Sequence, residues 1–197
     1  MSPTRLDRQL GFLREIDRLK TIMRRSPLLD RSRRENTAEH SWHLGMYAMV
    51  LAEYADGSID VLRVIRMLLI HDIVEIDAGD TPIHAHHDPL AQSEREHHAA
   101  LRIFGLLPPD QAQEFRLLWT EFETAESADA RFAKSLDRLQ PLIHNVATGG
   151  GTWLEANVSE AEVEQRYGPT IERGAAQLWD HAHELVQQHF ANATPES

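Results

Sequence analysis

The chain of 197 residues contains no cysteine. This absence excludes disulfide bonds, zinc sites built on thiolates and cysteine nucleophiles. No apolar run approaches the roughly 18 to 20 residues that a membrane-spanning helix needs. Residues 1–20 alternate charged and apolar side chains and lack the hydrophobic segment of a secretory signal. We therefore expect a cytoplasmic protein with no membrane partner, although a lack of cysteine fits any compartment.

Positive charge is also in deficit, because 20 Lys and Arg face 31 Asp and Glu, a formal net charge of -11. Nucleic-acid binding relies on Lys and Arg to displace counterions, so we expect no nucleic-acid partner. A small phosphorylated substrate remains possible, since a bound cation can reverse the sign of the local potential. Histidine, by contrast, is abundant, with 12 residues. It is the commonest metal ligand, so the positions of the histidines decide the argument.

The spacing of apolar residues is helical almost throughout, and no alternating strand pattern of useful length occurs. A first helix carries a leucine stripe, and Asn36 with Glu39 forms a capping-box variant that opens a second helix, ending near Tyr54. Further helices are predicted over about 60–76, 90–105, 109–122, from near 127, and over 159–190. Loops are predicted at 77–89 and 148–153. The sequence thus predicts an all-α, single-domain helical bundle over residues 1–192, with a frayed tail at 193–197.

Polar residues interrupt the apolar faces of three of these helices. His40 and His43 lie three residues apart on the second helix, and His71 shares a face with Glu75 on the third, beside Asp72. Asp137 lies between two leucines of a later helix. A buried charge costs several kcal/mol unless it is paired or bound to a metal. Imidazoles and carboxylates that project inward from facing helices are how helical bundles build metal sites.

These residues occur in longer motifs, namely "ENTAEHS" at 35–41, "HDIVEIDAGDTP" at 71–82 and "LWTEFETAESADARFAKSLDRLQ" at 118–140. In this order they resemble the HD-domain superfamily of metal-dependent phosphohydrolases, and most closely its small 5'-deoxynucleotidases. The resemblance covers nearly the whole chain. It implies a helical bundle of the HD-domain type, a homodimer, and a phosphomonoesterase that removes the 5'-phosphate from deoxyribonucleoside monophosphates.

The resemblance also implies the roles of single residues. It makes His40, His71, Asp72 and Asp137 the ligands of one divalent cation, with Glu75 assisting the attacking water. It places Asp80 against the substrate sugar or the water network and an arginine, Arg24 or Arg25, against the phosphate. The sequence departs from the family pattern here, because Arg24-Arg25-Ser26-Pro27 lacks the aromatic residue of an Arg-Trp pair. Substrate preference and the choice of arginine therefore stay open.

The residue types fit this chemistry without the family name. Two imidazoles and two carboxylates suit Mn, Fe, Co, Ni or Zn better than Mg or Ca. Such a cation acidifies the water that it coordinates, and Glu75, one turn from His71, can serve as a general base. Each ligand histidine needs an acceptor that fixes its tautomer, and Glu39 is a candidate.

Alternatives remain at several positions. His43 can replace His40 as the ligand, or lie behind it or near the substrate, which makes it a candidate substrate contact. Asp80 can simply initiate a turn, and Asp137 can be a solvated helix residue. His84, His86 and His87 form a cluster on a loop, where exposed side chains are the usual case. The alternative functions are an HD phosphodiesterase, a nucleoside-triphosphate hydrolase, or a non-catalytic, metal-stabilised helical interaction module.

Overall fold

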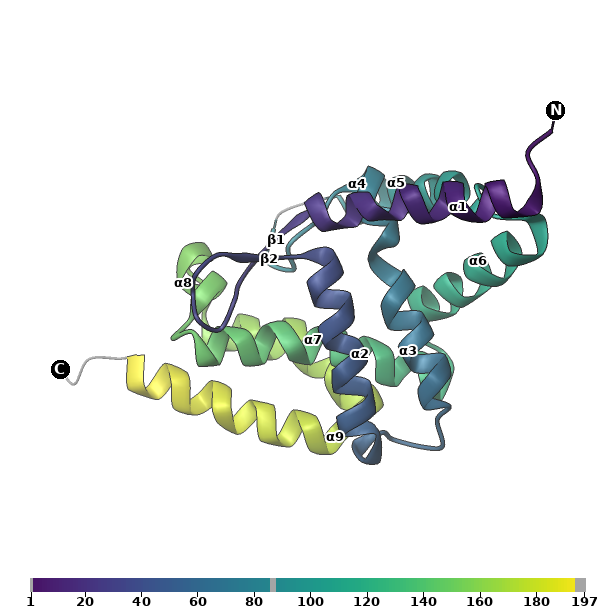
Figure 1. Ribbon diagram of the computed structural model, residues 1–197. Helices are drawn as coiled ribbons and strands as arrows, with labels where there is room; N and C mark the ends of the chain where they lie inside the picture. Colours follow the sequence, from purple (N-terminus) through teal and green to yellow (C-terminus); the bar gives the residue numbers. More distant parts are fainter. Residues whose placement is uncertain (1, 86–87, 194–197) are drawn as a thin grey trace.

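The computed structural model describes residues 2–85 and 88–193, and helices form nearly all of its regular structure, which confirms the all-α class (Figure 1). Of the predicted tail at 193–197, residue 193 ends the last helix, and residues 194–197 lie outside the described residues. No helix in the described part of the chain combines the length and apolarity that a bilayer crossing requires. The elements are α1 (Arg5–Ile16), η1 (Asp17–Thr21), β1 (Met23–Pro27), β2 (Arg34–Asn36), α2 (Thr37–Leu51), η2 (Ala52–Tyr54), α3 (Val61–Ile70), η3 (His71–Val74), α4 (Glu75–Ala78), α5 (Pro89–Phe104), α6 (Pro109–Thr124), α7 (Ala128–Ala147), α8 (Gly151–Ala156) and α9 (Glu160–Ala193).

Helices α2 and α3 lie side by side and cross α7, which packs along α9 on its other side (Figure 1). Helix α2 begins at the predicted cap: Asn36 Oδ1 accepts from the Glu39 amide at 3.0 Å, and the Glu39 carboxylate accepts from the Asn36 amide at 3.0 Å. This pairing satisfies two amides that the first turn leaves free. The cap therefore fixes where α2 starts, and with it the position of His40.

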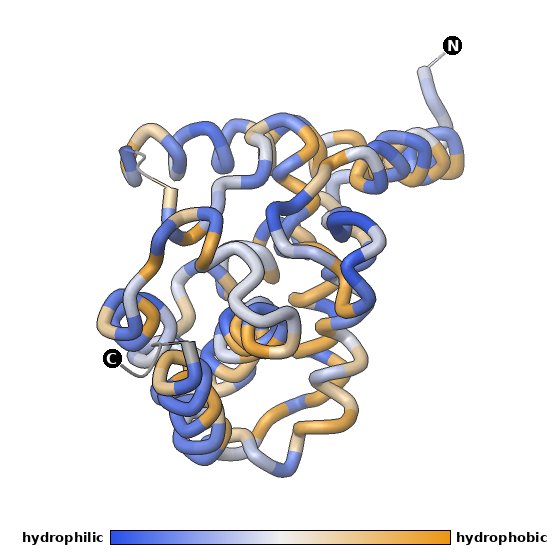
Figure 2. The backbone as a smooth tube through the Cα atoms, turned by 90° about the vertical axis from the view of Figure 1, so that its left-hand side faces the viewer, coloured by the Kyte–Doolittle hydropathy of each residue, from blue (hydrophilic) through white to orange (hydrophobic). Residues whose placement is uncertain are grey.

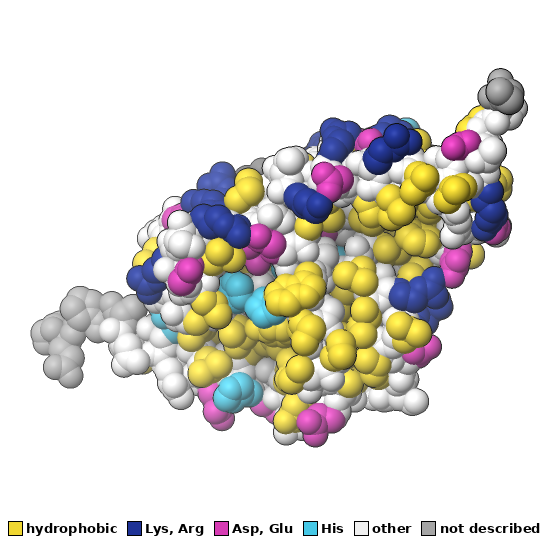
Figure 3. All heavy atoms as spheres, viewed as in Figure 1, with side chains coloured by type: hydrophobic (Ala, Val, Ile, Leu, Met, Phe, Trp, Pro, Cys, Tyr) yellow, Lys and Arg dark blue, Asp and Glu magenta, His cyan; other side chains and the backbone are white. Residues whose placement is uncertain are grey.

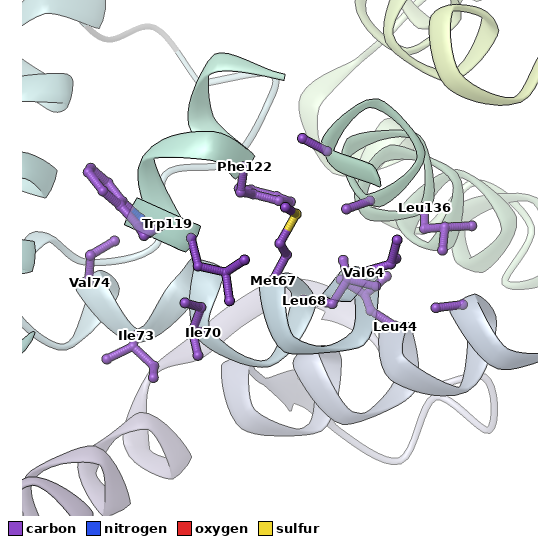
Figure 4. Close-up of a cluster of buried hydrophobic side chains, with 14 of the residues drawn as sticks. Leu44, Val64, Met67, Leu68, Ile70, Ile73, Val74, Trp119, Phe122 and Leu136 are labelled. Carbon is purple, nitrogen blue, oxygen red and sulfur yellow. The ribbon is translucent and has the colours of Figure 1, made fainter. Parts of the chain in front are cut away.

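The core lies where these helices meet. Leu44 of α2, Val64, Met67 and Leu68 of α3 and Leu136 of α7 are 0% exposed and pack together, as Figure 4 shows. Figure 2 shows hydrophobic and hydrophilic stretches alternating along the helices, the pattern of amphipathic helices. Burial of these side chains supplies the main favourable free energy of folding.

The third predicted helix is not continuous. The α-helical pattern stops after Ile70, residues His71–Val74 form a 3-10 turn, and a short α4 ends before Gly79. Side chains three residues apart eclipse each other in a 3-10 helix, whereas four-residue spacing defines a face in an α-helix. The 3-10 geometry of His71–Val74 therefore determines which side chains of residues 71–75 lie on the same face.

Two further predictions need correction, and the apolar stripe of α1 needs a description of its own. Strands β1 and β2 pair antiparallel in the basic segment, where no strand was expected, because five and three residues are too short for an alternating pattern. Helix α8 begins inside the predicted loop at 148–153. The leucine stripe divides: Leu6, Leu10 and Leu13 are 47–62% exposed, whereas Leu19 enters the core, as does Phe12.

Candidate metal centre and substrate cavity

Four side chains from α2, η3 and α7 converge at one buried point. His40 Nε2 lies 3.1 Å from Asp137 Oδ1 and 3.9 Å from Asp72 Oδ2. His71 Nε2 lies 3.0 Å from Asp72 Oδ1 and 3.6 Å from Asp137 Oδ1. The candidate ligand atoms of His40, His71 and Asp72 all lie within 4.8 Å of one another. The arrangement can bind a metal ion, because imidazole nitrogens and carboxylate oxygens face a common centre.

The far side of each imidazole ring is held by a hydrogen bond. His71 Nδ1 donates to the Leu68 carbonyl at 2.8 Å, and His40 Nδ1 lies 3.2 Å from Gln140 Oε1. His71 Nε2 is buried and has no hydrogen-bond partner among the described residues. A buried nitrogen left without a hydrogen bond beside two carboxylates fits a metal ligand. The residues present therefore fit a divalent cation.

The pKa shifts report the concentration of negative charge. Burial lowers the pKa of His71, but the Asp72 and Asp137 carboxylates outweigh burial and raise it to about 10. Burial and the Arg24 guanidinium lower the pKa of His40 to about 4. Burial, together with Asp72 and Asp80, raises the pKa of Glu75 to about 9. The carboxylates thus need a compensating cation, which a protonated His71 or a divalent metal ion can supply.

Arg24 supplies fixed positive charge to this cluster. Its Nη1 lies 3.2 Å from Asp72 Oδ2 and 3.8 Å from Asp80 Oδ1, and its Nε lies 3.3 Å from Glu35 Oε1. Burial lowers the pKa of this guanidinium, but the surrounding carboxylates outweigh burial and raise it. Arg24 therefore stays charged and ties strand β1 to the metal centre.

A cavity of about 610 Å³ opens onto these groups. Seven of the site residues predicted from the sequence line it, namely Arg24, Arg25, His71, Asp72, Glu75, Asp80 and Asp137. Glu75 accepts a hydrogen bond of 2.8 Å from the Thr37 hydroxyl. Burial raises the pKa of Asp80 against the opposing effect of Arg24. Since carboxylates, guanidinia and the candidate metal ligands share one cavity, a phosphoester could contact all of them at once.

His40 and His43 differ in their surroundings. His40 is fully buried behind the cavity, whereas the half-buried His43 is not a lining residue. The His43 ring lies 5.5 Å from that of His144, and its Nδ1 is 3.4 Å from Gln140 Nε2. His43 thus contacts the back of the metal centre, and its predicted contact with substrate has no support in this geometry.

Sequence reasoning missed several residues of the site. Gln140, not Glu39, faces the Nδ1 of His40, while Glu39 pairs with Arg33 and the α2 cap. Glu35 is a glutamate only 2% exposed, and Gln140 lies one turn after Asp137. The three-residue spacing between Asp137 and Gln140 was the feature of the sequence that could have identified Gln140. Further lining residues are Ser26, His84, Lys134, Arg138, Thr152 and Tyr167.

The predicted histidine cluster is only partly described. His84 lines the cavity with its ring 5.6 Å from that of Tyr167, and burial lowers its pKa to about 4. His86 and His87 lie outside the described residues.

Known proteins similar to this chain carry related names. The chain is 33% identical to the human 5'-deoxynucleotidase HDDC2 over 138 residues, which cover 68% of this chain and 65% of the human protein. It is 28% identical to a 5'-deoxynucleotidase of Yersinia pestis (strain Pestoides F) over 155 residues, 74% of this chain and 78% of that one. The match thus spans slightly less than two thirds of the human relative's length.

Solved structures share the fold. A crystal structure of a predicted metal-dependent phosphohydrolase from Magnetospirillum magnetotacticum MS-1 is 56% identical and superposes with a TM-score of 0.90, covering 96% of this chain and 94% of that one. A conserved hypothetical protein from Pyrococcus furiosus, at 20% identity and a TM-score of 0.59, covers 91% of this chain and 99% of that one, and shows the fold alone. The HD domain model matches residues 16–179, so the chain belongs to the HD domain family.

Proposed function

We propose that the protein is a divalent-metal-dependent phosphohydrolase that removes the 5'-phosphate from deoxyribonucleoside monophosphates. The observation that carries this proposal is the convergence of His40, His71, Asp72 and Asp137 at the base of a cavity that also holds Glu75. We propose these four side chains as the ligands of one Mn, Co, Fe, Ni or Zn ion, a choice that the nitrogen and oxygen donors favour over Mg.

The surrounding residues suit phosphate-ester hydrolysis. A bound divalent cation supplies positive charge and acidifies water. Positive charge in the cluster lowers the pKa of Glu75 from its raised value, so that its carboxylate can accept a proton from the attacking water. Arg24 and Arg25 line the same cavity and can donate to phosphate oxygens. Asp80 lies beside Arg24, where it can contact the sugar or order water.

The choice of a deoxynucleotide substrate rests on the relatives, since the human and the Yersinia pestis protein both bear the name 5'-deoxynucleotidase. The aromatic residue of the family pattern is missing after Arg25, whose side chain lines the cavity and whose charge lowers the pKa of Asp80. We infer that the Arg25 guanidinium, which lines the cavity, also meets the substrate phosphate.

The test is a matrix of metals and substrates. Purified protein is stripped with a chelator, reloaded with Mn, Co, Ni, Zn or Mg, and assayed for phosphate release from nucleoside and deoxynucleoside monophosphates. We expect release with a transition metal and faster turnover of the deoxy compounds. Pyrophosphate or triphosphate release from nucleoside triphosphates, or cleavage of a phosphodiester, would assign one of the alternative hydrolase activities instead. Metal binding without turnover of any ester would favour a non-catalytic module.

We also propose that the protein is a homodimer. Figure 3 shows hydrophobic side chains gathered over α1, α2 and α3. The members of this apolar face are 40–67% exposed: Leu6, Leu10, Leu13, Trp42, Met46, Met49, Val50, Leu62 and Leu69. Contiguous exposed apolar surface marks an interaction site, and twofold homo-oligomers are the commonest assemblies. The molar mass in solution tests this proposal.

We infer that residues 1–192 act as one domain, since buried hydrophobic side chains from Phe12 to Val186 join in a single cluster. Deoxynucleoside monophosphates are metabolites of the cell interior, so we propose the cytoplasm as the compartment. Fractionation of cells that produce the protein tests this proposal.

A further inference from the structure

We propose that Gln140, oriented by Glu35, is a positioning residue that holds His40 with the lone pair of its Nε2 facing the metal centre. The inference rests on the metal centre proposed above. Gln140 and Glu35 lie outside the expected ligand set, on the side of His40 that faces away from the candidate ion. Its tests measure metal binding and proton positions without substrate.

Gln140 is placed by the helix that also carries Asp137. The two residues lie one turn apart on α7, so that Asp137 Oδ1 faces His40 Nε2 at 3.1 Å while Gln140 Oε1 faces His40 Nδ1 at 3.2 Å. His40 and Gln140 are both 0% exposed. The ring is therefore held between two oxygens of the same helix, and water does not compete for either nitrogen.

The orientation of the Gln140 amide decides what His40 Nδ1 meets. An amide oxygen accepts hydrogen bonds and an amide nitrogen donates them, and the two ends have nearly the same size. If the nitrogen faced His40, Nδ1 would have to accept, and its proton would move to Nε2. A ring nitrogen that carries a proton cannot bind a metal ion. The metal centre therefore needs the oxygen of Gln140 toward His40.

Glu35 supplies the constraint that selects this orientation. Gln140 Nε2 lies 3.2 Å from Glu35 Oε2, and the glutamate side chain is 2% exposed. Rotation of the amide by half a turn would bring its oxygen against the carboxylate, where two acceptors repel. The same nitrogen also faces His144 Nε2 at 3.2 Å, which can accept as well. The acceptors around the nitrogen thus fix the oxygen toward His40.

Arg24 joins this arrangement to the cavity. Its Nε lies 3.3 Å from Glu35 Oε1, and its Nη1 lies 3.2 Å from Asp72 Oδ2. Glu35 is thus held by Arg24, which also contacts the candidate ligand Asp72. It is held as well by Gln140, which contacts His40. A glutamine that merely filled space would not need a buried carboxylate at its amide nitrogen, and burying that carboxylate is costly.

The first test is zinc affinity, measured by competition with a chelator. Loss of a partner that orients a ligand histidine typically weakens metal binding roughly 10–100-fold, and we expect this for Gln140→Leu. Glu35→Gln keeps the shape of the side chain and should also weaken zinc binding. An amide at position 35 can either donate or accept, so it no longer fixes the orientation of the Gln140 amide. Ser135→Ala is the matched control. Ser135 is buried on α7, but its hydroxyl faces the carbonyls of Arg131, Thr170 and Ile171 rather than the metal centre. The zinc affinity of Ser135→Ala should therefore match that of the wild type.

A swapped pair separates positioning from packing. In the double variant Glu35→Gln with Gln140→Glu, the new carboxylate can accept from His40 while the new amide donates to its other oxygen. We expect this variant to recover most of the affinity that either Glu35→Gln or Gln140→Leu loses. Wild-type affinity in both single variants would overturn the proposal, and so would a swapped pair no better than Gln140→Leu. If Gln140→Leu does not fold, wild-type affinity in Glu35→Gln, or a swapped pair no better than Glu35→Gln, would overturn the proposal.

The second test locates the proton. In the zinc-loaded wild type, nitrogen-15 NMR should find a slowly exchanging ring proton on Nδ1 of His40, and this signal should be lost or exchange faster in Gln140→Leu but not in Ser135→Ala. A proton on Nε2 of the zinc-loaded wild type would overturn the proposal. A wild type that binds no zinc or other transition metal would instead refute the metal centre itself, so the two failures are distinguishable.

Discussion

At the scale of single residues, the site gathers more negative charge than its arginine can balance. Glu35, Asp72 and Asp80 surround Arg24, while Asp137 and Glu75 lie nearby. Removing one partner of a buried charge pair leaves the other uncompensated and is strongly unfavourable. The same excess of negative charge opposes folding and favours binding of a divalent cation. Stability and metal affinity are therefore expected to be linked.

Glu75 gives the sharpest prediction at this scale. Glu75→Ala leaves the four proposed ligands in place but removes the proton acceptor, so metal content should be retained while kcat falls by roughly 10²–10⁴-fold, the usual contribution of general acid–base catalysis. Metal analysis of the purified variant and a phosphate-release assay check both parts. Glu114→Ala, which removes an exposed glutamate paired with Arg66, serves as the control. Undiminished turnover in Glu75→Ala would remove Glu75 from the mechanism.

Polar residues that interrupt apolar helix faces indicated the region of the site, and the family resemblance singled out the four candidate ligands. The pattern could not separate His40 from His43, since both lie on one face at three-residue spacing. Their difference arises from tertiary packing, which buries His40 against α7 and leaves His43 half-buried. Gln140 could not be recognised as the acceptor for His40, because the two residues lie 100 positions apart in the chain.

At the scale of elements, the turn after α4 brings Asp80 to the cavity. Gly79 has φ 77° and ψ 156°, a conformation that is essentially restricted to glycine. We expect Gly79→Ala to lower the free energy of unfolding by about 1–3 kcal/mol, and to reduce activity because the position of Asp80 shifts. Since an added Cβ meets nothing within 4 Å, any loss reports backbone strain rather than a clash. Chemical denaturation measures it, and stability equal to the wild type would contradict this explanation.

The cap of α2 gives a prediction with a pH dependence. Hydrogen bonds from Arg33 and the Asn36 amide lower the pKa of Glu39 to about 2 from 4.5. A carboxyl group whose pKa is lower in the folded state stabilises the fold above its unfolded pKa, and this stabilisation disappears as the pH falls through the folded pKa. Glu39→Gln should therefore lower Tm at pH 7, and the difference from the wild type should shrink between about pH 4.5 and 2. A difference that stays constant over this range would show that ionisation of Glu39 plays no part.

Most helices could be predicted because their apolar residues recur at three and four positions. The hydrogen-bond pattern within 60–76 could not, because the apolar run continues through η3, and the change to 3-10 geometry leaves no mark in residue type. The strands could not be predicted for a different reason. Arg34–Asn36 is polar and three residues long, and its pairing with β1 depends on contacts between the segments.

At the scale of the whole molecule, an apolar face over α1, α2 and α3 lies at the surface. Of the predicted leucine stripe, Leu6, Leu10 and Leu13 lie at the surface, whereas Leu19 is buried. Apolar periodicity identifies a face that avoids water, but it does not say whether the same chain or another copy covers it. The proposed homodimer would account for both the periodicity and the exposure.

A charge placed in this face tests the dimer. We expect Met49→Lys, at a side chain 61% exposed on α2, to convert the protein to a monomer without loss of helical content. Leu154→Lys is the matched control, because Leu154 is 69% exposed on α8, outside the apolar face. Light scattering after size-exclusion chromatography measures the molar mass. A monomeric wild type, or a dimer unaffected by Met49→Lys, would contradict this assignment.

The most direct test of the central claim is a titration of metal-stripped protein with Mn or Co, with bound metal and phosphate release from a deoxynucleoside monophosphate followed together. The account predicts that one ion binds per chain, that activity rises in proportion to occupancy, and that Asp72→Ala loses both. Full activity in the stripped protein, or unchanged ion binding in Asp72→Ala, would contradict it.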